Sequence, residues 1–217
     1  MNTSVVSWSG GKDSALALHY ARALGLNPTH LIVMMDESGE HSHSHGLSKQ
    51  LLNAQAHSLG MTLLTAPASW QTYERTFIEQ LTRMKSQGLT HAIFGDIDIE
   101  DHKLWEDSVA EAADLTPVLP LWQQSRLSLV QAVLELKIKP VICAIRKDVV
   151  PLDFLGRVFD TMCVNELCEL GIDPCGEAGE FHTVVVDSPD FEYPIAYHLG
   201  NVYETETTYH VNFIVND

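Results

Sequence analysis

The chain has 217 residues, of which 45% are hydrophobic, and it carries a formal net charge of -16. A chain of this length and composition can bury a sizeable core, which excludes an intrinsically disordered protein. The strong negative charge disfavours an extended nucleic acid as partner, because its phosphates need Lys and Arg contacts, but it leaves room for a small nucleotide.

The sequence also predicts a cytoplasmic protein. No apolar run approaches the roughly 18 residues of a membrane span. The N-terminal stretch MNTSVVSWSGG lacks the basic and apolar regions of a signal peptide. The four cysteines form no CxxC pair and no familiar zinc spacing, so free thiols in a reducing compartment are expected. We therefore expect neither a membrane partner nor a disulfide framework.

Apolar runs and amphipathic stretches alternate from the start of the chain, which is typical of βα units and a parallel sheet. The predicted strands are Thr3–Trp8, His30–Met35, Met61–Ala66, Thr90–Gly95 and Pro140–Ile145. The predicted helices are Ser14–Leu24, Leu47–Leu59, Thr72–Gln87, Trp105–Ala113 and Arg126–Leu136, with Pro117–Trp122 as a connector. This pattern predicts an α/β fold with an open, mostly parallel five-stranded sheet and helices on both faces.

The regular alternation of apolar runs and amphipathic stretches ends after Arg146. A loop-like segment precedes a predicted helix at Thr161–Leu170, and Gly and Pro punctuate the remainder, with strands at Thr183–Val186 and Tyr209–Val215. We expect a main α/β domain over residues 1–147 and a smaller C-terminal α+β part over residues 148–217.

The stretch Ser9–Ser14, SGGKDS, follows the first predicted strand and opens the first predicted helix. Ligands of open α/β folds bind at this edge of the sheet. The glycines let the backbone approach an anion, the serine hydroxyls can donate to it, and Lys12 adds a positive charge. The stretch is not a P-loop, because Val6 stands where its first glycine should be and Asp13 follows the lysine. We expect a phosphate-binding loop of another kind.

A second polar cluster lies in the segment Cys175–Pro189, CGEAGEFHTVVVDSP. Glycines beside charged groups suggest backbone brought close to a ligand, with carboxylates available for magnesium, an amine or ammonia. The alternative is a polar turn that leads into the strand Thr183–Val186. Cys175 itself has no identifiable base nearby in sequence, so a catalytic thiol is not expected.

The motif SGGKDS resembles the PP-loop of the ATP pyrophosphatase superfamily, whose members bind the pyrophosphate end of ATP and transfer AMP to a substrate. Combined with FGDID at Phe94–Asp98, LPLW at Leu119–Trp122 and GEAGEFHTVVVDSP, it resembles the diphthine-ammonia ligase family, also called the diphthamide synthase domain. The resemblance runs over most of the chain. It implies an ATP- and Mg²⁺-dependent ligase that forms AMP and pyrophosphate, in which ammonia attacks an adenylated carboxylate.

The resemblance and the chemistry of the side chains together give a set of expected site residues. The residues assigned to ATP are Ser9, Gly10, Gly11, Lys12, Asp13, Ser14 and Asp96, with Asp13 and Asp96 as expected magnesium ligands. The residues assigned to catalysis are Lys12, Asp13, Glu177, Glu180 and His182. The two glutamates would bind or deprotonate ammonium, and His182 would contact the substrate or transfer a proton. Gly179 and Thr183 are assigned to the acceptor substrate.

His182 is a departure from the family pattern. Members that make diphthamide usually carry a second acidic residue at this position, whereas a bacterial subgroup with a GEFHT-type motif is linked to cobalamin salvage. The acceptor therefore stays open between a modified histidine on translation elongation factor two, a corrinoid carboxylate and an unrelated small acid. A nucleotide-binding sensor without turnover is the alternative from another class, although retention of Glu177 and Glu180 favours the enzyme.

Four further expectations concern the surroundings of the site. Related glutaminase domains often open with an N-terminal cysteine, and this chain begins Met1-Asn2, so free ammonia is the expected nitrogen donor. The stretch His41–His45, HSHSH, is expected to be a polar, mobile loop over the site, with a substrate lid as the alternative. Trp70, Trp105 and Trp122 are expected to pack rather than to stack on a base. The sequence leaves the oligomeric state open, with a homo-oligomer as one option.

Overall fold

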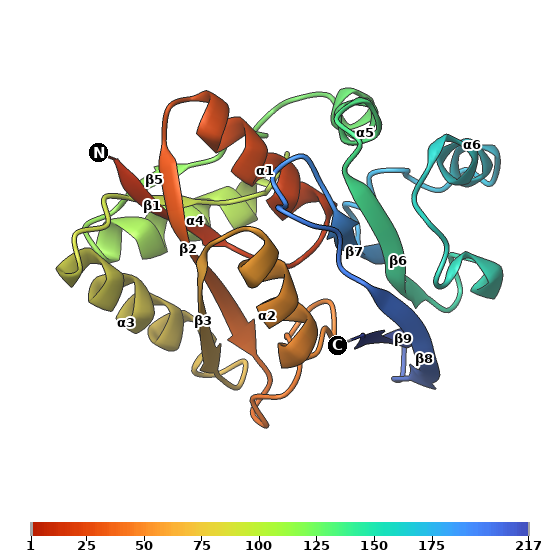
Figure 1. Ribbon diagram of the computed structural model, residues 1–217, viewed down its shortest axis with the longest axis horizontal. Coiled ribbons are helices and arrows are strands. Elements are labelled where there is room, and N and C mark those ends of the chain that lie inside the picture. The colour runs from red at the N-terminus through yellow and green to blue at the C-terminus, as the bar shows by residue number, and fades with distance from the viewer. Residues whose placement is uncertain (1, 217) are drawn as a thin grey trace.

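Two sheets make up the fold in the computed structural model, which describes residues 2–216 (Figure 1). The first sheet has five parallel strands in the order β3-β2-β1-β4-β5. The second sheet has four antiparallel strands in the order β7-β6-β9-β8. The α/β fold with a separate small C-terminal sheet confirms the predicted fold class.

The elements of the first sheet alternate between strand and helix along the chain. Its strands are β1 (Thr3–Ser7), β2 (Asn27–Met35), β3 (Thr62–Pro67), β4 (His91–Ile93) and β5 (Thr116–Val118). The helices of this part are α1 (Lys12–Ala23), α2 (Lys49–Ser58), α3 (Tyr73–Ser86), α4 (Glu100–Ala112) and α5 (Arg126–Glu135). The second sheet comprises β6 (Lys139–Arg146), β7 (Phe181–Asp187), β8 (Tyr197–Glu204) and β9 (Thr208–Val215), with the 3-10 helix η1 (Leu152–Phe154) and α6 (Thr161–Glu169).

Both faces of the parallel sheet are buried, which explains its continuous apolar strands. Because successive side chains of a strand point to opposite faces, Val5 and Val6 enter different cores. Val5 packs in the core that α3 and α4 contribute to, whereas Val6 packs in the core that α1, α2, α5 and the second sheet share. Figure 1 shows α3 and α4 on the other side of the sheet from α1 and α2.

The predicted identity of the fifth parallel strand is wrong. Pro140–Ile145 does form a strand, but it lies in β6, between β7 and β9 of the second sheet. The fifth strand of the parallel sheet is β5, which overlaps the start of the expected connector Pro117–Trp122 and pairs with β4. β5 is three residues long and has Pro117 at its centre, which only an edge strand tolerates because proline cannot donate to the ladder.

The second sheet packs against the first through the shared core rather than standing apart from it. The backbone N–H of Val185 in β7 donates to the carbonyl of Gly10, just before α1, over 2.8 Å. This contact brings the C-terminal segment to the carboxyl edge of the parallel sheet. The boundary at residue 147 stays a prediction, and β6 already pairs within the second sheet. Within residues 2–216 no helix is long and apolar enough to cross a membrane, and the cytoplasmic location stays a prediction.

Candidate functional site

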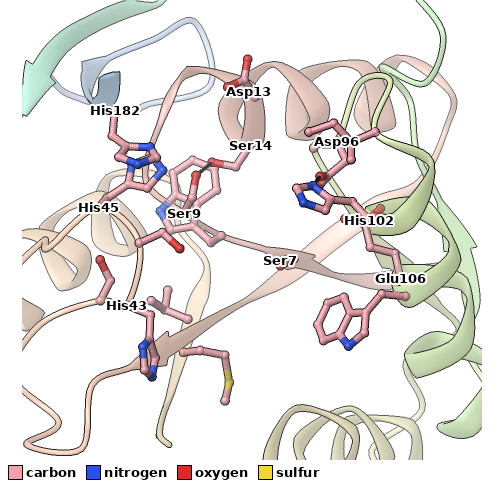
Figure 2. Close-up of a pocket in the computed structure, with 18 of the residues that line it drawn as sticks. Ser7, Ser9, Asp13, Ser14, His43, His45, Asp96, His102, Glu106 and His182 are labelled. Carbon is pink, nitrogen blue, oxygen red and sulfur yellow. Dashed lines mark hydrogen bonds and ion pairs between the residues drawn. The ribbon is translucent and has the colours of Figure 1, made fainter. Parts of the chain in front are cut away.

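A pocket of about 910 Å³ lies at the carboxyl edge of the parallel sheet (Figure 2). Its walls come from the ends of β1 and β2, the start of α1, the loop after β2, helices α3 and α4, and the turn before β7. Open parallel sheets bind ligands at this edge. Seven of the residues assigned from the sequence line the pocket, namely Ser9, Asp13, Ser14, Asp96, Glu177, Gly179 and His182.

The SGGKDS loop is held by its own serines. The hydroxyl of Ser9 accepts from the backbone N–H of Gly11 over 3.2 Å and lies 3.1 Å from the hydroxyl of Ser14. Gly10 has a φ of 81°, which a residue with a side chain rarely adopts. A Cβ on Gly11 would lie 2.7 Å from a ring carbon of His45. Gly10 is therefore required by its backbone conformation and Gly11 by close packing.

The C-terminal segment clamps the same loop. Thr183 accepts the backbone N–H of Lys12 over 3.1 Å, although the two residues stand 171 positions apart. The fully buried side chain of Gln55 donates to the carbonyls of Gly10 and Val185 at 3.0 and 2.7 Å. The carboxamide oxygen of Gln55 accepts from the indole N–H of Trp8 over 2.8 Å. One buried amide thus joins β1, the loop and β7, and sequence reasoning missed it because no local pattern marks Gln55.

Lys12 is buried rather than displayed in the pocket. Its side chain is 4% exposed, and its ammonium donates to both carboxylate oxygens of Asp13, at 3.0 and 2.8 Å, and to the carbonyl of Cys175. Burial is the largest single influence on Lys12 and would lower its pKa, but Asp13, Cys175 and Glu177 together outweigh it and raise the pKa above the usual value for lysine. Lys12 is therefore charged, and Asp13 brings that ion pair to the pocket wall.

The two predicted glutamates lie in different environments. Glu177 lines the pocket, and burial together with the nearby Asp13 raises its pKa to about 7. Glu180 is buried and lies outside the pocket lining, and its carboxylate accepts the backbone N–H of Ala178 over 3.0 Å. Glu177 thus lies in the candidate site, whereas the side chain of Glu180 points back toward the turn that precedes β7. Thr183 likewise faces the loop backbone rather than the pocket.

Histidines form one wall of the pocket. The rings of His45 and His182 lie 4.6 Å apart, and Nδ1–H of His45 donates to the carbonyl of Thr183 over 2.9 Å. Burial lowers the pKa of His45 to about 4 and that of His182 to about 3, so both are neutral at physiological pH. The HSHSH stretch lies over the site as predicted, with Ser42 to His45 in the lining. Its mobility stays a prediction.

Aromatic and acidic side chains form a further part of the pocket wall, where the rings of Trp70 and Tyr73 lie 4.7 and 5.4 Å from that of His43. The residues are Trp70, Tyr73, Phe77, Trp105 and Glu106. Trp70 is 70% exposed, and its ring packs on that of Tyr73 with 5.6 Å between centroids. That Trp70 does not stack on a base stays a prediction. Glu106 is 4% exposed. Its spacing from the buried Val109 and Ala110 places it on the buried face of α4, which is a signal the sequence did carry.

Comparison with protein families now identifies the family. The family model for the diphthamide synthase N-terminal domain matches residues 1–117, and the one for the diphthamide synthase C-terminal domain matches residues 125–215. The chain belongs to the diphthamide synthase family. This confirms the resemblance drawn from SGGKDS and GEAGEFHTVVVDSP, and it makes the protein an ATP-utilising member of the PP-loop superfamily.

One solved structure is distantly similar to this diphthamide synthase family member. A crystal structure from Methanocaldococcus jannaschii, described as a predicted subunit of tRNA methyltransferase, shares 17% sequence identity with a TM-score of 0.46. The match covers 87% of this chain and 98% of the other. At that identity and TM-score the likeness carries no functional argument. No curated protein matches the sequence.

The family implies Mg²⁺ along with ATP, and the residues of the pocket fit such an ion. Asp13 and Asp96 both line the pocket, and Asp96 accepts from Nδ1–H of His102 over 2.7 Å. Within the described part of the chain, no group of three or more His, Cys, Asp or Glu side chains could hold a metal by itself. Mg²⁺ in nucleotide sites usually takes only one or two carboxylates, with phosphates and water as its other ligands. Two carboxylates therefore suffice for Mg²⁺ that arrives with ATP.

Proposed function

We propose that this diphthamide synthase family member is an amide ligase of the diphthine-ammonia ligase type. It uses ATP to adenylate a carboxylate and free ammonia to convert the adenylate into an amide, with release of AMP and pyrophosphate. The observation that supports this most is the meeting of two distant segments at one pocket. Ser9–Ser14 supplies the features of a phosphate-binding loop, and Glu177–His182 supplies a titratable carboxyl and one neutral imidazole.

Adenylation overcomes the two reasons why a carboxylate does not react with ammonia in water. The carboxylate carbon is a poor electrophile, and its leaving group would be oxide. In the proposed reaction a carboxylate oxygen attacks the α-phosphorus of ATP and pyrophosphate leaves. Ammonia then attacks the acyl carbon, AMP leaves with the former carboxylate oxygen, and the nitrogen loses a proton. The protein has to orient these groups and to offset charge on the phosphates.

The side chains of the pocket suit these steps. Gly10, Gly11 and Lys12 lie in the loop behind the pocket lining, so the Lys12 ammonium is proposed to reach the phosphates by exchanging its contact with Asp13, next to the Gly10 and Gly11 amides. Mg²⁺ held by Asp13 and Asp96 would neutralise further charge. Glu177 is the proposed base toward ammonium or the attacking amine, because a base with a pKa near 7 works best near neutral pH. Neutral His182 is proposed to contact the acceptor.

A second candidate function differs only in the acceptor. The family resemblance links a histidine at position 182 to a subgroup acting in cobalamin salvage, and His182 lines the pocket beside His45. These neutral rings leave that wall less negative than a carboxylate would, which suits a small acid that must approach as an anion. A corrinoid carboxylate or another small acid is therefore the alternative substrate.

The test is to identify the nucleotide product and the nitrogen source. The purified protein is incubated with α-labelled ATP, Mg²⁺, ¹⁵N-ammonium and a small-molecule extract of its own host, and AMP is separated from ADP. AMP that appears only with extract, together with ¹⁵N in an amide product, supports the ligase. ADP as the product would contradict the proposal, and bound ATP without AMP would favour the sensor.

Lys12→Met measures the contribution of the phosphate end. The variant keeps the length of the buried side chain but removes its charge, so AMP formation should fall about 10² to 10³-fold. Lys49→Met, at an exposed lysine, is the matched control and should retain activity. Near-UV circular dichroism verifies that both variants are folded. A folded Lys12→Met protein with unchanged turnover would contradict the role of Lys12.

A further inference from the structure

We propose that Arg126 is a positioning residue, which joins the two walls of the pocket that carry Asp96 and Glu177 and holds them in a fixed arrangement. Neither the sequence motifs nor the family match gives Arg126 a role. The inference rests on the proposed function, because it concerns how a Mg²⁺ ligand and the base of that reaction stand relative to each other. Arg126 itself lies outside the pocket lining, so it acts through its neighbours.

Arg126 is the first residue of α5, and its guanidinium bonds to two carboxylates. Nε and Nη2 donate to the two carboxylate oxygens of Asp98, each over 2.7 Å, in a bidentate pair. Nη1 donates to Oδ2 of Asp173 over 2.5 Å. Because the guanidinium is planar and its donors are fixed in direction, these three bonds set the position of one carboxylate relative to the other.

The first carboxylate belongs to the β4 loop, residues 94–99, which connects β4 to α4. This loop contributes Gly95, Asp96 and Ile99 to the pocket lining. Asp98 stands two residues after Asp96 and points to Arg126 instead of the pocket. The bidentate pair therefore anchors the loop from behind, close to the expected Mg²⁺ ligand.

The second carboxylate begins the β7 turn, residues 173–180, which leads into β7. Oδ1 of Asp173 accepts the backbone N–H of Cys175 over 2.9 Å, and its carbonyl accepts that of Gly176 over 3.0 Å. Glu177 follows directly and lines the pocket. Asp173 thus shapes the turn that presents Glu177, while its other carboxylate oxygen is bound to α5.

Arg126 is the link between these two walls. Among residues 2–216, no other side chain makes hydrogen bonds to both the β4 loop and the β7 turn. Each wall also has a bond of its own. The backbone N–H of Gln123 donates to the carbonyl of Ile97 over 2.7 Å, and the carbonyl of Cys175 accepts from the Lys12 ammonium over 2.5 Å. Loss of Arg126 would therefore separate the walls from each other without detaching either from the fold.

The charge of Arg126 is out of place for the helix but suits this link. The N-terminus of a helix carries a partial positive charge and favours acidic residues, yet the first turn of α5 contains none. The carboxylates of Asp98 and Asp173 offset this repulsion, and without the guanidinium they would repel each other. The side chain of Arg126 is 37% exposed, and ion pairs at such sites contribute little to stability. We therefore expect Arg126 to affect the geometry of the pocket more than the stability of the fold.

Hydrogen exchange followed by mass spectrometry tests the link in the ligand-free protein. In Arg126→Gln, amide exchange in the β4 loop and the β7 turn should become at least about tenfold faster, because these segments open independently. The midpoint of urea denaturation should stay close to that of the wild type. Arg157→Gln is the matched control, because Arg157 makes a bidentate pair with Glu166, at 2.6 and 3.0 Å, outside the pocket lining. It should leave exchange in both segments unchanged.

A split between turnover and ATP binding tests the consequence for the reaction. AMP formation is measured with saturating ATP and ammonium and a fixed amount of host extract. Arg126→Gln should be about 10 to 10²-fold slower, because displacing positioned groups by about 1 Å has an effect of this size. Its dissociation constant for ATP, from isothermal titration, should stay within about threefold of the wild type, because Gln55 and Thr183 still hold the SGGKDS loop. Arg157→Gln should retain both values.

Asp173→Asn removes the same link from the other wall and replaces Arg126→Gln if that variant does not fold. It should slow AMP formation to a similar extent. The double variant Arg126→Gln/Asp173→Asn should be no more than about threefold slower than the single variants, because both changes break one contact. Effects that multiply in the double variant would overturn the inference.

Three further outcomes would overturn it. Unchanged exchange in both segments of folded Arg126→Gln would show that Arg126 does not join the walls. Wild-type AMP formation in Arg126→Gln would remove its role in the reaction while the proposed function stands. A wild type that forms no AMP would contradict the proposed function and the positioning role together, which is recognised before any variant is made.

Discussion

The two ends of the pocket are built in opposite ways. At the end formed by the SGGKDS loop, Lys12 pairs with Asp13, and Gln55 alone links Gly10, Val185 and Trp8. At the other end Oε2 of the buried Glu106 has no hydrogen-bond partner among residues 2–216, and Trp70 is 70% exposed. The difference shows that hydrogen bonds of the fold itself hold the first end together, whereas at the second end the fold leaves Oε2 of Glu106 without a partner among residues 2–216.

Substitutions at the two ends of the pocket should therefore affect stability in opposite ways. Substitution at the satisfied end should cost stability, because each change leaves a buried group without its hydrogen bond. Substitution at the unsatisfied end should not lower the free energy of unfolding and should affect binding. Active sites often pay for function with stability in this way.

The largest expected effect on stability is at Gln55. Gln55→Leu would leave the carbonyl of Val185 and the indole N–H of Trp8 without their side-chain partner in a buried setting. We expect the free energy of unfolding to fall by about 2 to 4 kcal/mol, measured by urea denaturation. Gln131→Leu on exposed α5 is the matched control and should change it by less than about 0.5 kcal/mol. A Gln55→Leu protein as stable as the control would contradict the view that hydrogen bonds of Gln55 stabilise this end of the pocket.

The next effect is on the pH dependence of AMP formation and concerns Glu177. The raised pKa of about 7 means that Glu177 gains its charge, and so its basicity, as the pH rises through 7. At a fixed concentration of un-ionised ammonia, the wild-type rate should therefore rise up to about pH 7 and then level off. Glu177→Gln should be about 10 to 10²-fold slower at pH 8 and should lose this dependence.

The exposed Glu192 supplies the control for that experiment. Glu192→Gln makes the same change on the surface and should keep both the rate and the pH profile. A Glu177→Gln protein that retains the wild-type profile would assign the titration to another group and would remove Glu177 from the proposed chemistry.

The smallest expected effect is an increase, rather than a decrease, in the free energy of unfolding of Glu106→Leu. Replacing a buried acid whose Oε2 lacks a partner among residues 2–216 by an apolar group of similar size should raise the free energy of unfolding by about 1 to 2 kcal/mol near pH 8. The raised pKa of Glu106 means that the folded state keeps a proton that the unfolded state releases above about pH 4.5. The wild type therefore loses stability as pH rises, and the gain should be smaller at pH 5.

Urea denaturation of the wild type and Glu106→Leu at the two pH values measures this effect, with Glu111→Leu as the surface control. Loss of stability in Glu106→Leu would mean that Glu106 has a structural partner, and the contrast between the two ends of the pocket would disappear.

The local pattern of the sequence determined most of the elements and one end of the site. The apolar runs of β1 and β2 are buried on both faces, and such strands are recognisable without knowing their neighbours. SGGKDS is also a local feature, because a strand, a tight loop and a helix start suffice to place it at the carboxyl edge. Family membership then confirmed what this motif and the GEAGEFHTVVVDSP segment indicated together.

Only the tertiary structure decided which distant groups meet. The apolar run in β6 suits a central strand of either sheet, and its pairing with β7 and β9 depends on residues far along the chain. Glu177 and Glu180 look equivalent in sequence, yet one faces the pocket and the other accepts Ala178 N–H, because the bend before β7 sets their directions. Glu106 acquires its environment from Asp96 on another segment. Burial and charge at such positions are properties of the assembled fold, since solvent exclusion and Coulomb interaction depend on distance in space and not along the chain.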